Sequence, residues 1–204
     1  MAGVKQASRN AITLKGSTDI VAEFFTYGIN SILYQRGLYP PESFTRVQKY
    51  NLTLLVTADD ELNNYLNSVV NQVREWLYNM TVQKLVIVIK CADTNEVLER
   101  WQFNVECDKT VTEDSAPGEK SEDDIKKEIS AVIRQITASV TFLPLLESAC
   151  VFDILVYTDK DLEVPSEWGE SAPGIISNSE EVRLRSFTTT IHKVEGMVAY
   201  KLSA

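Results

Sequence analysis

Histidine and cysteine are scarce in this chain, which leaves little material for catalysis or metal binding. The 204 residues include one histidine, His192, and three cysteines, Cys91, Cys107 and Cys150. One histidine does not supply a three-residue metal site. Three widely spaced cysteines form neither a CxxC site nor a disulfide framework, so reduced thiols are expected. His192 lies in an alternating Thr/Ile run and is expected on a strand surface or partly buried.

Catalytic motifs are also missing. The sequence contains no GxSxG, GxxxxGK[ST], GxGxxG or HExxH. The acidic clusters Asp59-Asp60 and Glu122–Asp124 are explained as charges at helix N-termini. Acid pairs are the one arrangement left for general acid–base chemistry, but a chain this acidic supplies such pairs by chance. We therefore expect no enzyme, no catalytic residue, no metal and no cofactor.

Basic charge and long apolar runs are lacking as well. Lys plus Arg number 20 against 29 Asp plus Glu, giving a net charge of −9. This balance argues against nucleic acid or an anionic membrane as the main partner. The longest apolar run, LVIVI at 85–89, is strand-sized, and the N-terminal MAGVKQASRNAITLKG has no apolar run of signal-peptide length. The composition is typical of one globular domain, residues 1–204.

Two segments have the apolar spacing of long helices. TDIVAEFFTYGINSILYQRG begins after Ser17, a candidate N-cap, and ends at Gly37, a natural C-terminal cap. In TADDELNNYLNSVVNQVREWLY, Thr57 and Asp60 are spaced as a capping box. Trp76, near the end of the second helix, is expected in the core, although a Trp at a helix end can also line a groove.

A third helix is predicted in SEDDIKKEISAVIRQITASVTFLP, between Ser121 as N-cap and Pro144 as terminator. Its apolar stripe is formed by Ile125, Ile129, Val132, Ile133, Ile136 and Val140. Ala131, Arg134 and Ala138 lie on the opposite face, and Gln135 and Phe142 lie nearer its flank. Two interpretations stay open for these residues: packing under a neighbouring loop, or a protein-contact surface.

Strand patterns alternate with these helices. Residues 51–57, 82–90, 96–107 and 150–158 are β-prone, and 82–107 reads as a hairpin with one buried and one more polar face. A short alternation at Ile12 and Leu14 suggests an edge strand. The predicted fold class is α+β: three long helices packed on a mainly antiparallel sheet.

The C-terminal part contains an unusual segment. Asp159–Ser179 has little periodicity and is longer than a typical connection, which indicates either a functional loop or disorder. Val182–Val194 and Met197–Leu202 follow as a predicted hairpin that turns at Glu195-Gly196. Because an ordered hairpin lies beyond the segment, we favour a functional loop.

Several contiguous runs resemble the HORMA-domain spindle-checkpoint proteins of the mitotic-arrest-deficient type. The runs are IVAEFFTYGINSILYQRGLYPPESF, LTLLVT, EWLY, VLERWQF, VIRQITASVTFLPLLE and SEEVRLRSFTTTIHKV. The likeness covers nearly the whole chain and weakens in residues 1–10, in the 108–124 loop and at the C-terminal end. The polymerase-associated and meiotic-chromosome branches of the family share the architecture and remain the alternative.

The resemblance implies a non-enzymatic adaptor that captures short peptide motifs and switches between open and closed folds. It implies a core of about 12–158 and a mobile part of about 159–204. Asp159–Ser179 would be a safety belt across the captured peptide, and is called the belt segment below; about twenty residues span at most about 65–70 Å. The peptide would add to a sheet edge at Trp76, Phe152, Ile154, Leu155, Val156 and Tyr157. The relocating hairpin would include Val182, Leu184, Phe187, Ile191, Val194 and Tyr200.

The resemblance also implies partners and a second surface. The partners would be a coiled-coil kinetochore checkpoint protein, the activator of the anaphase-promoting complex, a second copy in an open–closed dimer, a silencing HORMA-like factor and a remodelling AAA+ ATPase. Dimerisation would use Arg134, Gln135, Thr141 and Phe142. The expected location is the nucleus, kinetochore, cytoplasm and spindle region. Glu195-Gly196 stands where relatives can carry a serine, so phosphoregulation at that position is not expected here.

Overall fold

A computed structural model describes residues 12–116 and 118–202 of the chain. The prediction that the N-terminal stretch carries no targeting segment falls mostly on residues 1–11, which lie outside the described residues. The order of elements is α1 (Leu14–Gln35), η1 (Pro41–Ser43), β1 (Phe44–Lys49), β2 (Leu52–Thr57), α2 (Asp60–Tyr78), β3 (Val82–Cys91), β4 (Val97–Cys107), α3 (Glu122–Ala138), η2 (Ser139–Thr141), β5 (Cys150–Thr158), β6 (Ser179–Thr188) and β7 (His192–Lys201).

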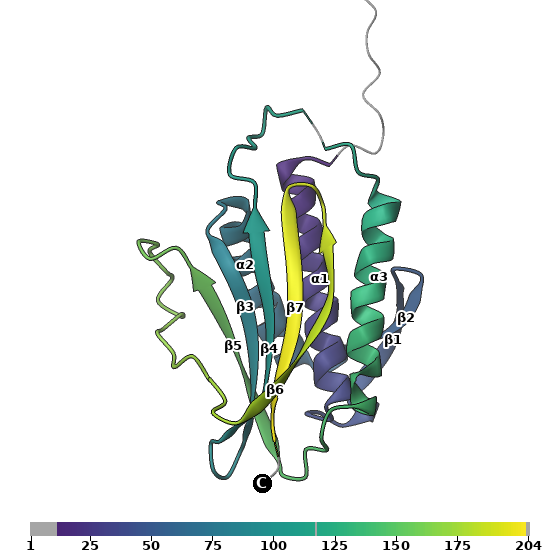
Figure 1. Cartoon of the computed structure of the whole chain (residues 1–204), viewed down its shortest axis with the longest axis vertical. Helices are drawn as coiled ribbons and strands as arrows, with labels where there is room; N and C mark the ends of the chain where they lie inside the picture. The colour runs from purple at the N-terminus through teal and green to yellow at the C-terminus, as the bar shows by residue number, and fades with distance from the viewer. Residues whose placement is uncertain (1–11, 117, 203–204) are drawn as a thin grey trace, which may run out of the picture.

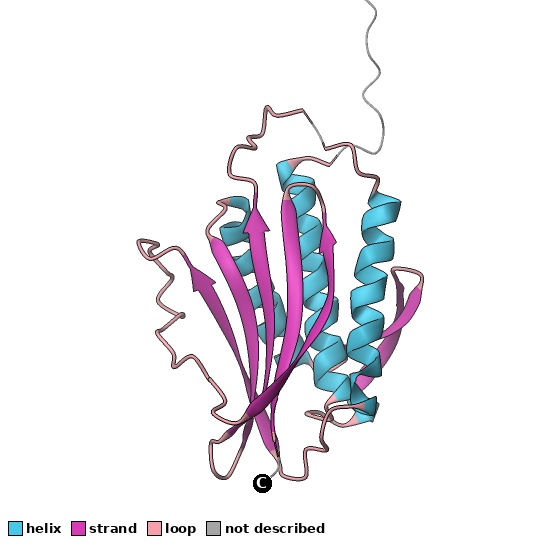
Figure 2. Cartoon of the chain, viewed as in Figure 1, coloured by secondary structure: helices cyan, strands magenta, loops and turns pink. Residues whose placement is uncertain are grey.

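The main sheet is antiparallel and has the strand order β5-β3-β4-β7-β6. α1, α2 and α3 all lie on one side of it, as Figures 1 and 2 show. Alternate β3 residues such as Leu85, Ile87 and Ile89 join the core cluster with the apolar stripes of the helices. The predicted α+β class with three long helices on an antiparallel sheet is therefore confirmed.

A buried ion pair joins the end of α1 to this sheet. Arg36 Nη2 lies 2.5 Å from Glu99 Oε1 and also donates to the carbonyl of Pro144. The indole N–H of Trp101 donates to the second Glu99 oxygen at 3.1 Å. Because a buried carboxylate without partners is costly, these donors explain how β4 accommodates an acid on its core face.

The start of α1 differs from the prediction. Thr13 is the N-cap, its hydroxyl accepting from Gly16 N–H at 3.0 Å, and Ser17 is buried inside the helix. Leu14 begins the helix, so the proposed edge strand at Ile12 and Leu14 is wrong; Ile12 forms only an isolated bridge. At the other end, positive φ at Gly37 agrees with the predicted cap.

Two further helix boundaries were misplaced. Asp59, rather than Thr57, caps α2 by accepting from Leu62 N–H at 2.8 Å. Ser121 caps α3 as predicted, but the α-helix ends at Ala138 and tightens into a 3-10 turn well before Pro144. That change of winding rotates Val140 off the apolar stripe, and its side chain is 47% exposed instead of buried.

The C-terminal hairpin turns earlier than predicted. Its turn is at 189–191, where Thr189 Oγ1 accepts from the N–H groups of Ile191 and His192. Glu195-Gly196 lies inside β7 instead. A Cβ on Gly196 would come within 3.1 Å of the Phe103 ring, so this glycine permits close strand packing and does not mark a turn.

His192 is fully buried, in contrast to its expected partly exposed position. Its Nδ1 lies 2.7 Å from Ser17 Oγ of α1, and Ser17 Oγ lies 2.5 Å from Thr189 Oγ1. Burial lowers the pKa of His192 to about 4, because the apolar surroundings disfavour the charged ring. The histidine therefore serves as a neutral link between the hairpin and α1.

The sequence prediction missed one strand. β1 pairs with β2 in a separate two-stranded sheet, with Phe44 opposite Thr57 and Lys49 opposite Leu52. The connecting residues Tyr50 and Asn51 both have positive φ, as a tight hairpin turn requires.

Candidate functional site

β5 is an edge strand of the main sheet. Among the described residues β5 pairs with β3 alone. The N–H of Ala92 donates to the carbonyl of Ala149 at 2.8 Å, so these two residues are a hydrogen-bonded pair of the β3–β5 ladder. This pair shows which of the following pairs are hydrogen-bonded and which are not. Since bonded and non-bonded pairs alternate along an antiparallel ladder, Phe152, Ile154 and Val156 direct their N–H and C=O groups outward. β5 therefore offers backbone groups to an added strand.

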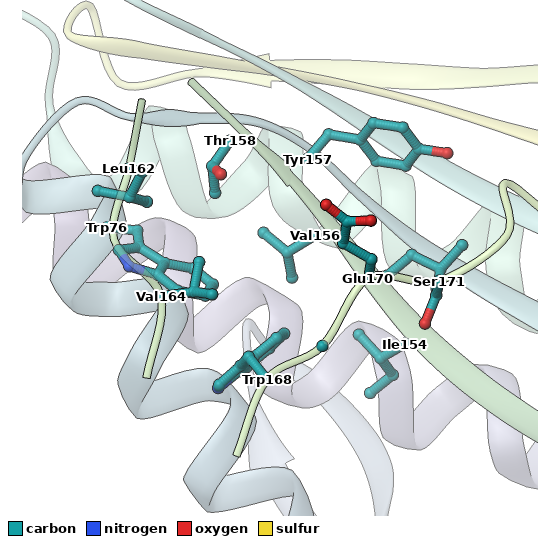
Figure 3. A pocket seen from close by; sticks show the side chains of 12 residues that line it. Trp76, Ile154, Val156, Tyr157, Thr158, Leu162, Val164, Trp168, Glu170 and Ser171 are labelled. Carbon is teal, nitrogen blue, oxygen red and sulfur yellow. The ribbon is translucent and has the colours of Figure 1, made fainter. Parts of the chain in front are cut away.

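A cavity of about 510 Å³ lies beside this free edge, between β5 and the belt segment. Figure 3 shows side chains of β5 on one side of the cavity and side chains of the belt segment on the other. It is lined by Trp76, Ile154, Leu155, Val156, Tyr157, Thr158, Leu162, Val164, Trp168, Gly169, Glu170 and Ser171. The mixture of apolar walls and a few polar groups suits an extended peptide.

Two tryptophans that line the cavity contact each other. The rings of Trp76 and Trp168 are 4.9 Å apart and tilted by 66°, an edge-to-face contact. Trp76 is buried in α2 and also lines the cavity, so both interpretations of this residue are correct. Figure 3 shows Trp168 reaching from the belt segment towards the cavity. This contact holds the middle of the belt segment to the helical layer.

Five of the six predicted edge residues line this cavity, and Phe152 does not. Phe152 lies earlier on β5, where its ring packs edge-to-face against Tyr39 and Tyr65. Its backbone still belongs to the free edge.

The belt segment is anchored where it leaves β5. Asp159 N–H donates to the Thr81 carbonyl at 3.0 Å. Its carboxylate accepts from Gln83 at 3.2 Å and from Lys109 at 3.4 Å. These hydrogen bonds hold the pKa of Asp159 below its usual range.

The belt segment is anchored again near β6. It runs along the outer side of β5 and then passes to the opposite end of the sheet, as Figure 1 shows. Arg100 Nε donates to the Pro173 carbonyl at 3.2 Å. Gly174, at φ 61°, lies so close to Val88 that an added Cβ would be 2.8 Å from its side chain. The segment therefore crosses the sheet face that the helices leave uncovered.

The opposite edge of the sheet is covered. β6 packs along α3, where Gln135 Oε1 accepts from the N–H of Arg185. Glu128 Oε2 accepts from the N–H of Thr188 at 3.3 Å. Phe187, one of the predicted hairpin residues, is fully buried between the two elements and α1. These side chains occupy amides that a further strand would need.

The other predicted hairpin residues lie on the same two strands and their turn. Ile191 and Val194 are buried, and Val182, Leu184 and Tyr200 are partly buried against the core. In this structure β7 pairs with β4, so the hairpin forms the edge of the sheet opposite to β5.

The predicted contact surface lies on α3 and the η2 turn that follows it, and none of its residues lines the cavity. Arg134, Thr141 and Phe142 are exposed, and Phe142 is 42% exposed. Gln135 differs from the others because its side chain oxygen is engaged by β6. Its position on the helix flank therefore serves the hairpin in this structure.

Sequence reasoning missed the cavity residues that the belt segment supplies. They are Leu162, Val164, Trp168, Gly169, Glu170 and Ser171. A lone Trp168 in an otherwise aperiodic, polar segment was the available signal, because a large aromatic side chain there needs a surface to pack on.

The described residues contain no group of three or more His, Cys, Asp or Glu side chains that would hold a metal ion. No helix in the described part of the chain is long and apolar enough to cross a membrane.

Comparisons with known proteins identify the family. The HORMA domain model matches residues 17–192. The chain therefore belongs to the HORMA domain family. It is 69% identical over 198 residues to the mitotic spindle assembly checkpoint protein MAD2A of Homo sapiens, covering 97% of each chain. Within the family, it is a member of the spindle checkpoint branch.

Solved structures agree with this placement. A chain in the crystal structure of the mitotic checkpoint complex superimposes with a TM-score of 0.84 and 48% identity, covering 92% of this chain and 99% of that one. The polymerase branch is more distant: DNA polymerase zeta subunit 2 of Drosophila melanogaster is 28% identical over 144 residues, 70% of each chain.

Proposed function

We propose that this checkpoint protein is a non-enzymatic adaptor that captures a short linear peptide on β5 and encloses it with the belt segment. The free β5 edge beside an apolar cavity carries the proposal, because β-augmentation needs unpaired backbone groups next to side-chain pockets. Trp76, Ile154, Leu155, Val156 and Tyr157 would form the pocket walls. Phe152 would contribute its backbone.

The position of the hairpin supports a closed fold for this structure. With β7 on β4, the β5 edge is accessible; a hairpin paired with β5 would occupy the same backbone groups. We infer that the open fold has the hairpin there. The movable part would be about residues 159–204, and the core about residues 12–158. Such relocation of a strand pair between two edges is a two-state switch.

The partners follow from the checkpoint branch. We infer that the captured motifs come from a coiled-coil kinetochore checkpoint protein and from the activator of the anaphase-promoting complex, so that capture delays anaphase. The remaining partners would be an open–closed second copy, a silencing HORMA-like factor and a remodelling AAA+ ATPase. Action at the nucleus, kinetochore, cytoplasm and spindle region fits this role.

Peptide capture is tested with a synthetic, fluorescein-labelled peptide that carries the motif of the coiled-coil partner. Anisotropy gives the saturation curve, and a chase with excess unlabelled peptide gives the release rate. We expect saturable binding and release over many minutes, because the belt segment must open before the peptide leaves. Fast release would contradict the role of the belt segment, and absence of binding would indicate the peptide preference of another HORMA branch.

The α3 surface is tested separately with Arg134→Ala. We propose that Arg134, Thr141 and Phe142 form the contact with a second copy, Arg134 through charge-assisted hydrogen bonds and Phe142 as the apolar anchor. The variant should lose self-association in sedimentation while keeping peptide affinity. Lys127→Ala, another exposed cation of α3, is the matched control. A variant that dimerises like the wild type would refute this role.

A further inference from the structure

Two cysteines face each other across the β3–β5 ladder. Cys91 is the last residue of β3 and Cys150 is the first residue of β5, and the register places them directly opposite each other. Both are free thiols; Cys91 is buried and Cys150 is half-buried. They are far apart in the sequence, so only the fold brings them together.

The backbone hydrogen bonds around the two cysteines show whether they form a hydrogen-bonded or a non-hydrogen-bonded pair of the antiparallel ladder. The N–H of Cys91 donates to the Glu96 carbonyl, and the Cys91 carbonyl accepts from Asn95, both at 2.9 Å and both on the side of the β3–β4 connection. On the β5 side, the neighbouring Ala92 makes the bond, to Ala149. Cys91 and Cys150 are therefore a non-hydrogen-bonded pair.

This type of pair suits a disulfide. In antiparallel sheets the Cα atoms of a non-hydrogen-bonded pair are about 4.5 Å apart and the side chains approach more closely than in bonded pairs. A disulfide needs Cα atoms roughly 4.4–6.8 Å apart. Because the pair stands at the ends of both strands, small adjustments there disturb little of the ladder.

The surroundings of the two thiols differ. Hydrogen bonds with Thr94 and Ser148 lower the pKa of the Cys91 thiol to about 7, whereas burial raises the pKa of Cys150. The ion pair of Arg36 and Glu99 is close enough to act on Cys150. A thiol that ionises near neutral pH beside a second thiol is the arrangement of a reactive and a resolving cysteine.

We propose that Cys91 and Cys150 are a redox-active dithiol that a peroxide oxidises to a cross-strand disulfide. The Cys91 thiolate attacks one oxygen of hydrogen peroxide, the O–O bond breaks, and sulfenic acid forms with release of hydroxide, which the proton lost by Cys91 converts to water. The Cys150 sulfur then attacks the Cys91 sulfur, the S–O bond breaks, and a second water leaves with the Cys150 proton. Two thiols are oxidised by two electrons and one peroxide is reduced to two waters.

The disulfide would tie the first residue of β5 to β3. The cavity lies at the other end of the strand, from Ile154 onwards, and the outward groups of Ile154 and Val156 remain free. The site is thus independent of the proposed peptide capture, and its test uses no peptide.

The test maps disulfides in the full-length chain. The protein is treated with hydrogen peroxide, remaining thiols are blocked with iodoacetamide, and peptides are identified by mass spectrometry without reduction. We expect a cross-linked peptide pair containing Cys91 and Cys150, lighter by two hydrogens than the free peptides. Cys107, at the opposite end of the sheet and with its pKa raised by burial, should be recovered alkylated.

Variants sharpen the result. Cys107→Ser should form the cross-link at the wild-type rate, and Cys150→Ser should form none and accumulate further oxidised Cys91. We expect Cys91 to react at least about tenfold faster than Cys107, since the thiolate is the nucleophile. Wild-type protein in which Cys91 and Cys150 are both alkylated after peroxide, or in which the bond joins either one to Cys107, would overturn the proposal without need of any variant.

Discussion

The two edges of the sheet are treated oppositely by the same chain. At β6, side chains of α3 take up the amides of Arg185 and Thr188, and Phe187 is buried beneath them. At β5, the outward backbone groups have no strand partner among the described residues, and the belt segment stands off behind a cavity. Exposed edges invite pairing with other chains and are normally blocked. The contrast supports the proposal that β5 receives a partner peptide.

The hairpin that forms the covered edge also contains the buried His192, for which we predict the largest effect. His192 links the hairpin to α1 through Ser17. Burial holds the pKa of His192 in the folded protein at about 4, below the usual 6.5. Folding therefore favours the neutral ring over the charged ring. The contribution is full above pH 6.5 and is lost as the pH falls towards 4, about 3 kcal/mol in all.

Urea unfolding at several pH values between neutral and about 4 measures this effect. His192→Asn should show a shallower decline of the unfolding free energy than the wild type. Because other acids titrate alike in both proteins, the difference between the two curves isolates the histidine. Parallel curves would contradict a buried neutral ring.

Val156→Pro tests whether peptide binding at the open β5 edge depends on the outward backbone N–H groups. Proline removes an N–H that points outward, so the β3–β5 ladder keeps its bonds. We expect peptide affinity to fall by about thirtyfold, roughly 2 kcal/mol, for one lost hydrogen bond and altered strand geometry. Val156→Ala keeps the N–H and should bind more tightly than the proline variant. Equal affinity in the two variants would mean that the side chain alone matters.

The smallest predicted effect is on stability, from loss of the hydrogen bond between Gln135 and the β6 backbone. Gln135→Ala should lower the free energy of unfolding by about 1 kcal/mol, because the Arg185 N–H loses its acceptor. Lys127→Ala, at an exposed position of the same helix outside the proposed dimer contact, is the control and should change stability by less than about 0.5 kcal/mol. If chemical denaturation gives the two variants the same stability, the amide is not capped by α3 in solution.

The sequence predicted most of what depends on local patterns. Alternation located β5 at Cys150–Thr158, and apolar spacing with Ser121 located the start of α3. The end of α3 was misjudged because Val140 continues the stripe in sequence while the chain tightens to a 3-10 turn. Such a change of winding carries little signal in residue types.

Features that need distant contacts were not predicted. His192 is buried because Ser17, 175 residues away, supplies its partner. Gly196 resembled a turn residue, yet it is required by the ring of Phe103 on the neighbouring strand. Only the β5 wall of the cavity was predicted, from strand alternation and family resemblance. The wall formed by the belt segment was not, because it depends on the contact of Trp168 with Trp76.

We propose that β5, and not β6, receives the peptide. Residue-resolved hydrogen exchange, measured with and without the synthetic partner peptide, distinguishes the two edges. We predict that the amides of Ile154 and Val156 become protected on binding while those of Arg185 and Thr188 do not change. Protection confined to β6, or a bound peptide that leaves the β5 amides as exchangeable as before, would contradict the account.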